Sequence, residues 1–152
     1  MLNKDDTLLN ELLSDDNLKI AKQRIKKNKG ASGIDGMEVK ELDEYLSKHL
    51  DEIKEQIRNK KYSPKPVKRV EIPKPDGSVR NLGVPTVVDR FVQQAIAQVL
   101  TPIYEPKFSE SSYGFRPNRC CEMAILKALE FMNDGYQWVV DIDLEKFFDN
   151  VN

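Results

Sequence analysis

The sequence predicts an α/β (α+β) fold, because the period of its hydrophobic pattern changes along the chain. Apolar residues at spacings of three and four, typical of amphipathic helices, recur in residues 8–27, 39–59 and 88–100. Between the last two of these ranges, short runs rich in β-branched residues flank an Asp-Gly turn signal. We therefore expect several helices around one β-hairpin, packed as a single unit.

The N-terminal third is predicted to be helical with one interruption. Residues 8–13 and 18–27 each fit a helix, the second strongly basic. Residues 28–36 contain three glycines within seven positions and show no periodicity, which predicts a loop. One or two helices follow in residues 39–59, where an apolar seam faces a core: Leu42, Leu46, Leu50, Ile53 and Ile57.

The hairpin is predicted over residues 67–84, with its turn at Pro75-Asp76-Gly77. Thr86 and Asp89 then form the pattern of a capped helix start. We expect this helix to end at Pro102 and to bury one apolar stripe, made of Val88, Phe91, Val92, Ala95, Ile96, Val99 and Leu100.

The C-terminal part is predicted as a helix followed by a strand. Cys121, Ile125, Leu129 and Met132 lie at helical spacing, and residues 133–135 end the helix. Residues 137–144 read as a strand. The adjacent thiols Cys120 and Cys121 suit neither an ordinary disulfide framework nor zinc-ligand spacing, so we expect them to be packed in a core. We also expect Trp138 to lie in the core. The single histidine, His49, is expected to be exposed to solvent.

Composition limits the class of protein. A chain of 152 residues with 39% hydrophobic content is large enough for one core. No apolar run approaches the ~20 residues that cross a bilayer, and the start of the chain lacks the features of a signal peptide, so we expect a cytoplasmic protein without a membrane partner.

The charge of the chain is unevenly distributed. The formal net charge is −1, but eight basic and two acidic residues give residues 58–80 a charge of +6. Such a block is either a solvated face or an electrostatic footprint for phosphates.

Two carboxylates interrupt the predicted C-terminal strand. Alternation puts Val140, Ile142 and Leu144 on one face and Asp141 and Asp143 on the other, ~6.5–7 Å apart. Acids in an apolar strand are costly unless they bind a cation or reach solvent. Mg²⁺ prefers carboxylate oxygens, and nucleotidyl transfer uses two such ions. The alternative is an exposed edge strand whose acids face water.

Four ordered motifs resemble those of reverse transcriptases of the kind encoded by group II introns. They are the loop at residues 28–36, the hairpin at 72–85, Ser111-Ser112-Tyr113-Gly114-Phe115-Arg116-Pro117, and the palm-like segment at 143–150. The resemblance implies a partial right-hand polymerase fold, with helix-rich fingers, a β-hairpin and the first catalytic palm strand. It divides the chain into an N-terminal extension with a template-gripping loop (1–35), fingers (36–118) and the start of the palm (119–152).

At the palm motif, the resemblance implies that Asp143 is the first catalytic, metal-binding carboxylate and that the backbone carbonyl of Leu144 is a second ligand of Mg²⁺. Phe148 becomes the aromatic gate beneath the sugar of the incoming nucleotide, where a ring excludes a 2′-hydroxyl; otherwise it is a core phenylalanine. Asp141, two residues further into the strand, is expected to help position the metal ligands without binding the metal itself.

At the hairpin, Lys74 and Arg80 flank the turn, and the resemblance makes them the residues that bind the nucleotide triphosphate. Without the motif they would be two solvated charges. Lys68 and Arg69 are implied to contact the template backbone. In the glycine loop, the resemblance assigns RNA binding to Gly30, Ser32 and Gly33, whose backbone amides lie open to phosphates; an ordinary interhelical turn is the alternative.

Tyr113, Phe115 and Arg116 are suited to stack on or clamp unpaired RNA bases. The family pattern usually continues with a glycine and a serine, whereas this chain has Asn118-Arg119-Cys120. That departure leaves residues 118–120 without an assigned role.

The implied function is RNA-directed DNA synthesis by two-metal nucleotidyl transfer, together with assistance to intron splicing. Its partners would be group II intron RNA, a DNA or RNA primer and deoxynucleoside triphosphates. The aromatic-x-Asp-Asp tetrapeptide that supplies the other carboxylates does not occur in the sequence, so we expect a fragment that is inactive alone. The alternatives are an RNA-binding splicing factor that uses the fold as a non-catalytic clamp, and a retron or diversity-generating relative.

Overall fold

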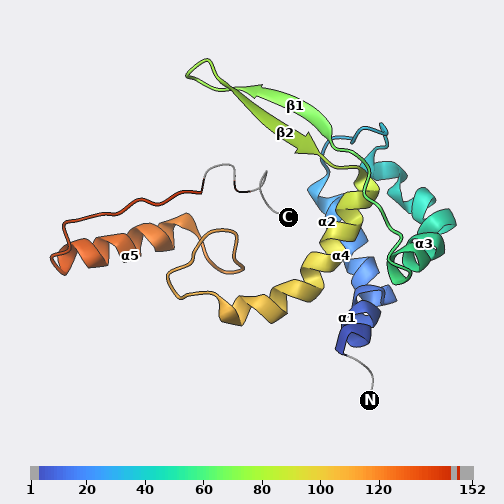
Figure 1. Cartoon of the computed structure of the whole chain (residues 1–152), viewed down its shortest axis with the longest axis horizontal. Coiled ribbons are helices and arrows are strands. Elements are labelled where there is room, and N and C mark those ends of the chain that lie inside the picture. Colours follow the sequence, from blue (N-terminus) through green and yellow to red (C-terminus); the bar gives the residue numbers. More distant parts are fainter. Residues whose placement is uncertain (1–3, 145–146, 148–152) are drawn as a thin grey trace. The chain divides into compact units, whose positions relative to one another are not determined.

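The computed structural model describes residues 4–144 and residue 147. Within them, five α-helices and one two-stranded sheet follow the order α1, α2, α3, β1, β2, α4, α5 (Figure 1). The chain divides into two compact units, one up to Pro106 and one from Lys107 onwards, rather than the single unit expected from the sequence. None of the described helices is long and apolar enough to cross a membrane.

The two N-terminal helices form as predicted and are set by local signals. α1 spans Lys4–Leu12 and α2 spans Asp15–Asn28. Ser14 caps α2, because its side chain accepts a hydrogen bond from the Asn17 N–H at 3.3 Å. Acidic residues in the first turn of α2 and basic residues in its last turn complement the helix dipole.

α3 spans Leu42–Arg58 and follows the short 3-10 helix η1 (Val39–Glu41). The predicted apolar seam is confirmed. Leu42, Leu46 and Ile53 are buried, and Leu50 and Ile57 pack partly buried against the same core.

α4 spans Val87–Tyr104, and the predicted cap is present, since the Asp89 N–H donates to Thr86 Oγ1 at 3.1 Å. Pro102 does not end the helix, contrary to the sequence prediction. A proline removes only its own N–H from the helical ladder, and the next turn is closed by the Glu105 N–H donating to the Thr101 carbonyl. The 3-10 helix η2 (Glu105–Lys107) follows directly.

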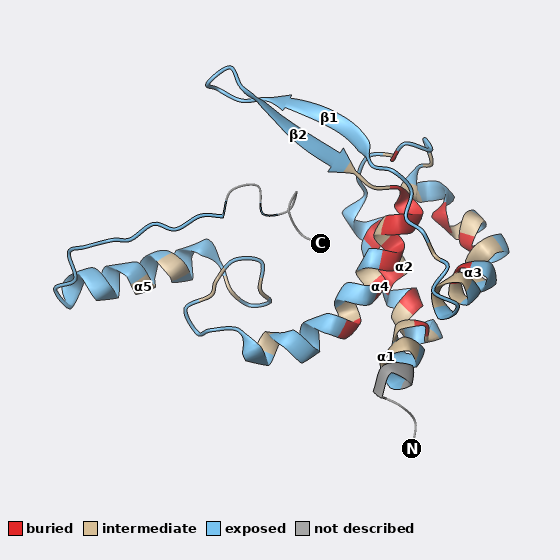
Figure 2. Cartoon of the chain, viewed as in Figure 1, coloured by how far each residue is buried: buried red, intermediate tan, exposed pale blue. Residues whose placement is uncertain are grey.

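The core of the first unit lies where α2, α3 and α4 meet. Buried residues gather on these three helices, whereas the described hairpin and α5 carry none (Figure 2). Phe91 is 1% exposed at the centre. The predicted stripe of α4 is correct except for Ile96 and Leu100, which are 38% and 39% exposed. Ile96 and Leu100 lie outside the face of α4 that packs on neighbouring helices. The helical period predicts the direction of that face but not its width.

The predicted hairpin is confirmed with its turn. β1 (Lys68–Pro73) and β2 (Val79–Val84) pair antiparallel, with Ile72 opposite Arg80. The Lys74 N–H donates to the Ser78 carbonyl at 2.8 Å, and Gly77, at φ +80°, takes the left-handed position of the turn. Residues 68–83 are exposed.

In the second unit, α5 spans Cys121–Asn133 and ends as predicted. Gly135, at φ +96°, allows its N–H to donate to the Met132 carbonyl and the Tyr136 N–H to donate to the Phe131 carbonyl.

The strand predicted over residues 137–144 does not form among the described residues. In the part of the chain that the structure describes, the only sheet consists of β1 and β2. Residues 137–144 alternate between apolar and polar side chains, but they have no neighbouring strand to pair with their backbone groups. The predicted burial of Trp138 and of Cys120 and Cys121 is also wrong, because Trp138 is 94% exposed and both thiols are exposed. His49, predicted to lie in solvent, is half-buried, with its ring 4.5 Å from the Tyr45 ring and its Nδ1 3.3 Å from Glu52 Oε2.

We expect Phe91→Ala to lower the free energy of unfolding by about 3–5 kcal/mol, because it removes the ring at the centre of the three-helix core. Ile20→Ala is the control, since Ile20 on α2 is 45% exposed and should cost about 0.5 kcal/mol or less. Urea denaturation followed by circular dichroism measures both. Equal effects of the two substitutions would contradict the location of the core.

Candidate nucleic-acid interface

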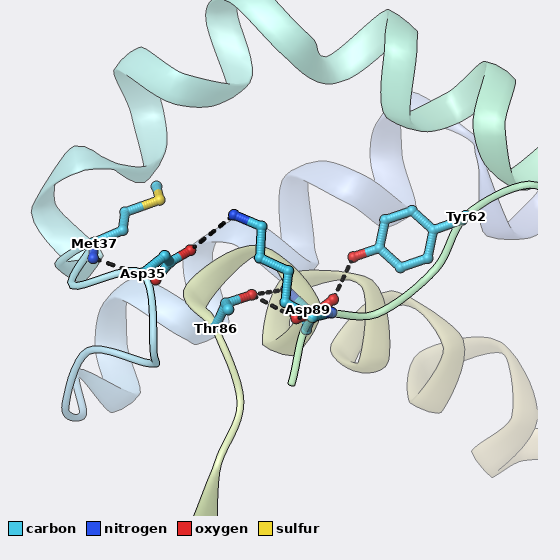
Figure 3. A network of polar contacts seen from close by, with 6 residues as sticks. Asp35, Met37, Tyr62, Thr86 and Asp89 are labelled. Carbon is cyan, nitrogen blue, oxygen red and sulfur yellow. Dashed lines mark hydrogen bonds and ion pairs between the residues drawn. The ribbon is translucent and has the colours of Figure 1, made fainter. Parts of the chain in front are cut away.

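A buried carboxylate lies at the first turn of α4. Asp89 is 4% exposed and accepts three hydrogen bonds (Figure 3). The donors are the Tyr62 hydroxyl at 2.7 Å, the Lys65 backbone N–H at 3.2 Å and the Thr86 hydroxyl at 2.6 Å. Three donors and the N-terminus of a helix compensate for the loss of hydration, so the carboxylate is stable in this position.

The partners of Asp89 come from both ends of the hairpin. Tyr62 and Lys65 lie in the segment that leads from α3 to β1, and Thr86 lies two residues after the end of β2. Segments on either side of the hairpin are therefore bound to one side chain. We refer to Tyr62, Lys65, Thr86 and Asp89 as the Asp89 junction.

The glycine loop, residues 29–36, lies against the same place. A Cβ on Gly33 would stand 2.6 Å from the Thr86 Cα and 2.8 Å from the Thr86 nitrogen, closer than side chains approach backbone. Glycine is thus required at position 33 for the loop to contact the start of α4. This packing buries Gly33, and it leaves Gly30 exposed and Ser32 partly exposed.

Two polar contacts hold the glycine loop beside the start of α4, one from Lys65 and one from Arg90. Lys65 Nζ lies 3.3 Å from Asp35 Oδ2, and the other oxygen of Asp35 accepts the Met37 N–H at 3.3 Å (Figure 3). Arg90, the residue after Asp89, donates through Nη2 to the Ala31 carbonyl at 2.8 Å. The loop is thus fixed at Ala31, Gly33 and Asp35.

The hairpin register decides which basic side chains share a face. Opposite residues of an antiparallel pair project to the same face, and alternate residues along a strand do too. Arg80 pairs with Ile72, so Arg80 and Lys68 are on one face of the hairpin. Lys74 follows β1 and lies beside the turn, where its N–H donates to the Ser78 carbonyl. Arg69 is on the opposite face. The register thus places Lys68 and Arg69 on opposite faces, although both were predicted to contact the template backbone.

The four basic residues of this hairpin region are available to an anion. Lys68, Arg69, Lys74 and Arg80 are exposed, and among the described residues none of them forms an ion pair with a carboxylate. Exposed, unpaired cations concentrated on one element produce a local positive field in a chain whose net charge is −1.

The loop before α5 carries the aromatic and arginine residues expected to contact RNA. Arg116 donates to the Ser109 carbonyl at 2.7 Å and the Ser112 carbonyl at 2.9 Å, so its guanidinium closes the loop. Tyr113 lies under the guanidinium of Arg119, whose carbon is 5.4 Å from the ring centroid. Phe115 is fully exposed at φ +57°.

The carboxylates of the palm-like segment are exposed. Asp141 and Asp143 lie in an extended stretch outside any strand, and Asp143 Oδ1 accepts the Leu144 N–H at 2.9 Å. Among the described residues, no three His, Cys, Asp or Glu side chains gather where they could hold a metal ion. The oxygen donors of Asp143 and Leu144 suit Mg²⁺ in kind but not in number, since Mg²⁺ takes six ligands. Phe148 lies outside the described residues.

Sequence reasoning missed the Asp89 junction. The Thr86-x-x-Asp89 spacing identifies the helix start but not the partners of the carboxylate, because Tyr62 is 27 positions away. The one available signal is the choice of Asp at the third helical position, where a capping box usually has Glu or Gln.

The chain matches a known family over more than half its length. Residues 72–152 fit the family model described as "Reverse transcriptase (RNA-dependent DNA polymerase)". The chain therefore belongs to the reverse transcriptase family.

Within that family, the chain is homologous to proteins of group II introns and to intron maturases. It is 36% identical over 142 residues to the group II intron-encoded protein LtrA of Lactococcus lactis subsp. cremoris, covering 93% of this chain and 23% of LtrA. Over 150 residues it is 33% identical to the putative COX1/OXI3 intron 1 protein of Saccharomyces cerevisiae, covering 99% of this chain and 18% of that protein. The chain thus spans less than a quarter of either relative.

A solved structure agrees with this placement. The chain resembles a chain of a partial Cas6-RT-Cas1–Cas2 complex with a TM-score of 0.52 and 25% sequence identity, covering 95% of this chain and 23% of that one. The helices and hairpin therefore match part of a reverse transcriptase fold.

Tyr62 gives the junction a signature at high pH. Burial, and then the adjacent Asp89 carboxylate, raise the pKa of the Tyr62 hydroxyl well above its ordinary value of about 10. The folded state holds this proton more tightly than the unfolded state does, so the stabilisation is complete below about pH 10 and is lost as pH rises further. We expect the difference in unfolding free energy between the wild type and Tyr62→Phe to shrink above about pH 10.

Urea denaturation at a series of pH values measures this difference. Tyr136→Phe is the control, because Tyr136 is 69% exposed and its substitution should shift the curve little. Wild-type and Tyr62→Phe curves that stay parallel up to about pH 12 would contradict the role of the hydroxyl.

Proposed function

We propose that this chain is the fingers and the start of the palm of a reverse transcriptase that copies group II intron RNA into DNA and assists splicing of that intron. The observation that carries the proposal is the exposed basic hairpin fixed beside the glycine loop. Membership of the reverse transcriptase family and homology to LtrA and the maturases support it. We assign residues 1–35 to the extension and template loop, 36–118 to the fingers and 119–152 to the palm.

The incoming deoxynucleotide is bound by the tip of the hairpin. Lys74 directly follows β1 and Arg80 is the second residue of β2, so the two residues flank the tip of the hairpin, and both are exposed. The planar guanidinium of Arg80 binds two phosphate oxygens at once, whereas Lys74 contributes a compact charge. Phe148 excludes a 2′-hydroxyl by steric contact with the sugar, which selects deoxynucleotides.

The RNA template is bound by the glycine loop and the base of the hairpin. Gly30 and Ser32 present backbone amides to phosphates, and Lys68 and Arg69 add charge. Gly33 was expected to bind RNA as well, but it is buried against Thr86 and contributes by holding the loop in place. In the second unit, the exposed ring of Phe115 stacks on an unpaired base. Arg116 keeps this loop in shape through the Ser109 and Ser112 carbonyls, and Tyr113 offers a second ring.

Asp143 is the catalytic carboxylate of this proposal. Its carboxylate oxygens and the Leu144 carbonyl would hold the divalent ions on which polymerase chemistry depends, and the other ligands would come from outside the described residues. Asp141 acts on Asp143 indirectly, through the local field and the shape of the segment.

We expect Asp143→Asn to lower primer extension on an RNA template by about three orders of magnitude in the reverse transcriptase that carries this chain. The substitution keeps the shape of the side chain and removes the anionic ligand, so RNA binding should survive in a filter-binding assay. Asp141→Asn is the matched control and should cost much less. Near-normal extension by Asp143→Asn would refute the assignment, and a wild type that binds RNA but never extends a primer would favour the non-catalytic clamp.

We also expect charge reversal at Lys68 and Arg69 to weaken RNA binding. Each phosphate contact releases counterions, so the double variant should reduce the slope of log affinity against log salt by about 1 to 2. The double variant Lys19→Glu with Arg24→Glu is the control, because it places the same charge change on exposed sites of α2. Fluorescence anisotropy with a labelled single-stranded RNA measures affinity at several salt concentrations. An unchanged slope would exclude the hairpin base from the interface.

A further inference from the structure

We propose that Asp89 is a positioning residue that couples the glycine loop to the hairpin, so that both elements contact one RNA strand at the same time. The inference rests on the proposed function, in which loop and hairpin each bind RNA. It concerns a buried residue that touches no RNA itself and acts only through the elements it holds.

The first part of the coupling is the base of the hairpin. A two-stranded hairpin without cover on either face is marginally stable and sets no direction for itself. Here the Tyr62 hydroxyl and the Lys65 N–H, ahead of β1, and the Thr86 hydroxyl, after β2, all donate to one carboxylate at 2.6–3.2 Å. Since α4 carries that carboxylate, the base of the hairpin is fixed to the helical core.

The second part is the glycine loop. Lys65 links the two elements, because its backbone N–H donates to Asp89 while its Nζ lies 3.3 Å from Asp35 of the loop. Gly33 lies against the backbone of Thr86, which is itself bound to Asp89. The loop and the hairpin thus meet at residues that Asp89 holds.

The junction depends on the acceptor oxygens of Asp89. The carboxylate accepts from three donors at two oxygens, whereas a leucine side chain of similar shape accepts none. Asp89→Leu is therefore nearly isosteric but removes all three hydrogen bonds. Asp35→Asn is a second variant that weakens only the contact of the loop with Lys65 and leaves the core untouched.

Coupling predicts an effect that depends on RNA length. Two sites held in fixed geometry bind a strand that spans both with a gain in effective concentration, whereas a short strand engages only one. The probes are labelled single-stranded oligouridylates of about 4 and about 12 nucleotides, within the range of single-strand site sizes. Fluorescence anisotropy gives both affinities, and the ratio of long to short is the readout. The ratio is unaffected by a smaller folded fraction, and a control variant with the same change in charge accounts for electrostatics.

We expect the ratio to fall about tenfold or more in Asp89→Leu, and to fall in Asp35→Asn and Tyr62→Phe, with short-strand affinity kept. Asp43→Asn is the matched control, because Asp43 pairs with Lys22 and Lys26 on the surface, away from the junction, and its ratio should equal that of the wild type. If the three junction variants keep the wild-type ratio, the positioning role is overturned while RNA binding stands. If the wild type binds neither oligonucleotide, the RNA-binding function fails and the coupling fails with it.

Discussion

The arrangement of the first unit depends on the burial of one carboxylate. A buried acid is tolerated only when its oxygens are satisfied, and Asp89 meets that requirement with donors from the segments before and after the hairpin. The three-helix core supplies stability without specifying where the hairpin points. The junction supplies direction, because its hydrogen bonds form only when Tyr62, Lys65 and Thr86 converge on the start of α4.

Local signals explain most of what the sequence predicted correctly. The turn at Pro75-Asp76-Gly77, the Thr86 cap and the Gly135 helix end each depend on a few adjacent residues, and all three are present. Family membership was also predictable, since the motifs are contiguous strings and residues 72–152 match the reverse transcriptase model.

Apart from the helix end expected at Pro102, the failures are nonlocal. Residues 137–144 alternate like a strand, but a strand is defined by the partner that pairs with it, and the alternation of Val140 and Asp141 carries no information on that partner. Ile96 has the period of a core residue, yet its exposure depends on which side of α4 its neighbours cover. The partners of Asp89 are hidden for the same reason, because spacing within a helix does not reveal contacts 24 or 27 positions away.

The exposure of the hairpin separates the residues that fold the protein from those that recognise a ligand. No described residue of β1, and none of β2 before Val84, contributes to the buried core, so replacing Val70, Ile72 or Leu82 leaves the helices as they are. These positions are therefore constrained by strand pairing and by any molecule bound to the hairpin, not by the core. Position 33, by contrast, is constrained by its contact with the backbone of Thr86.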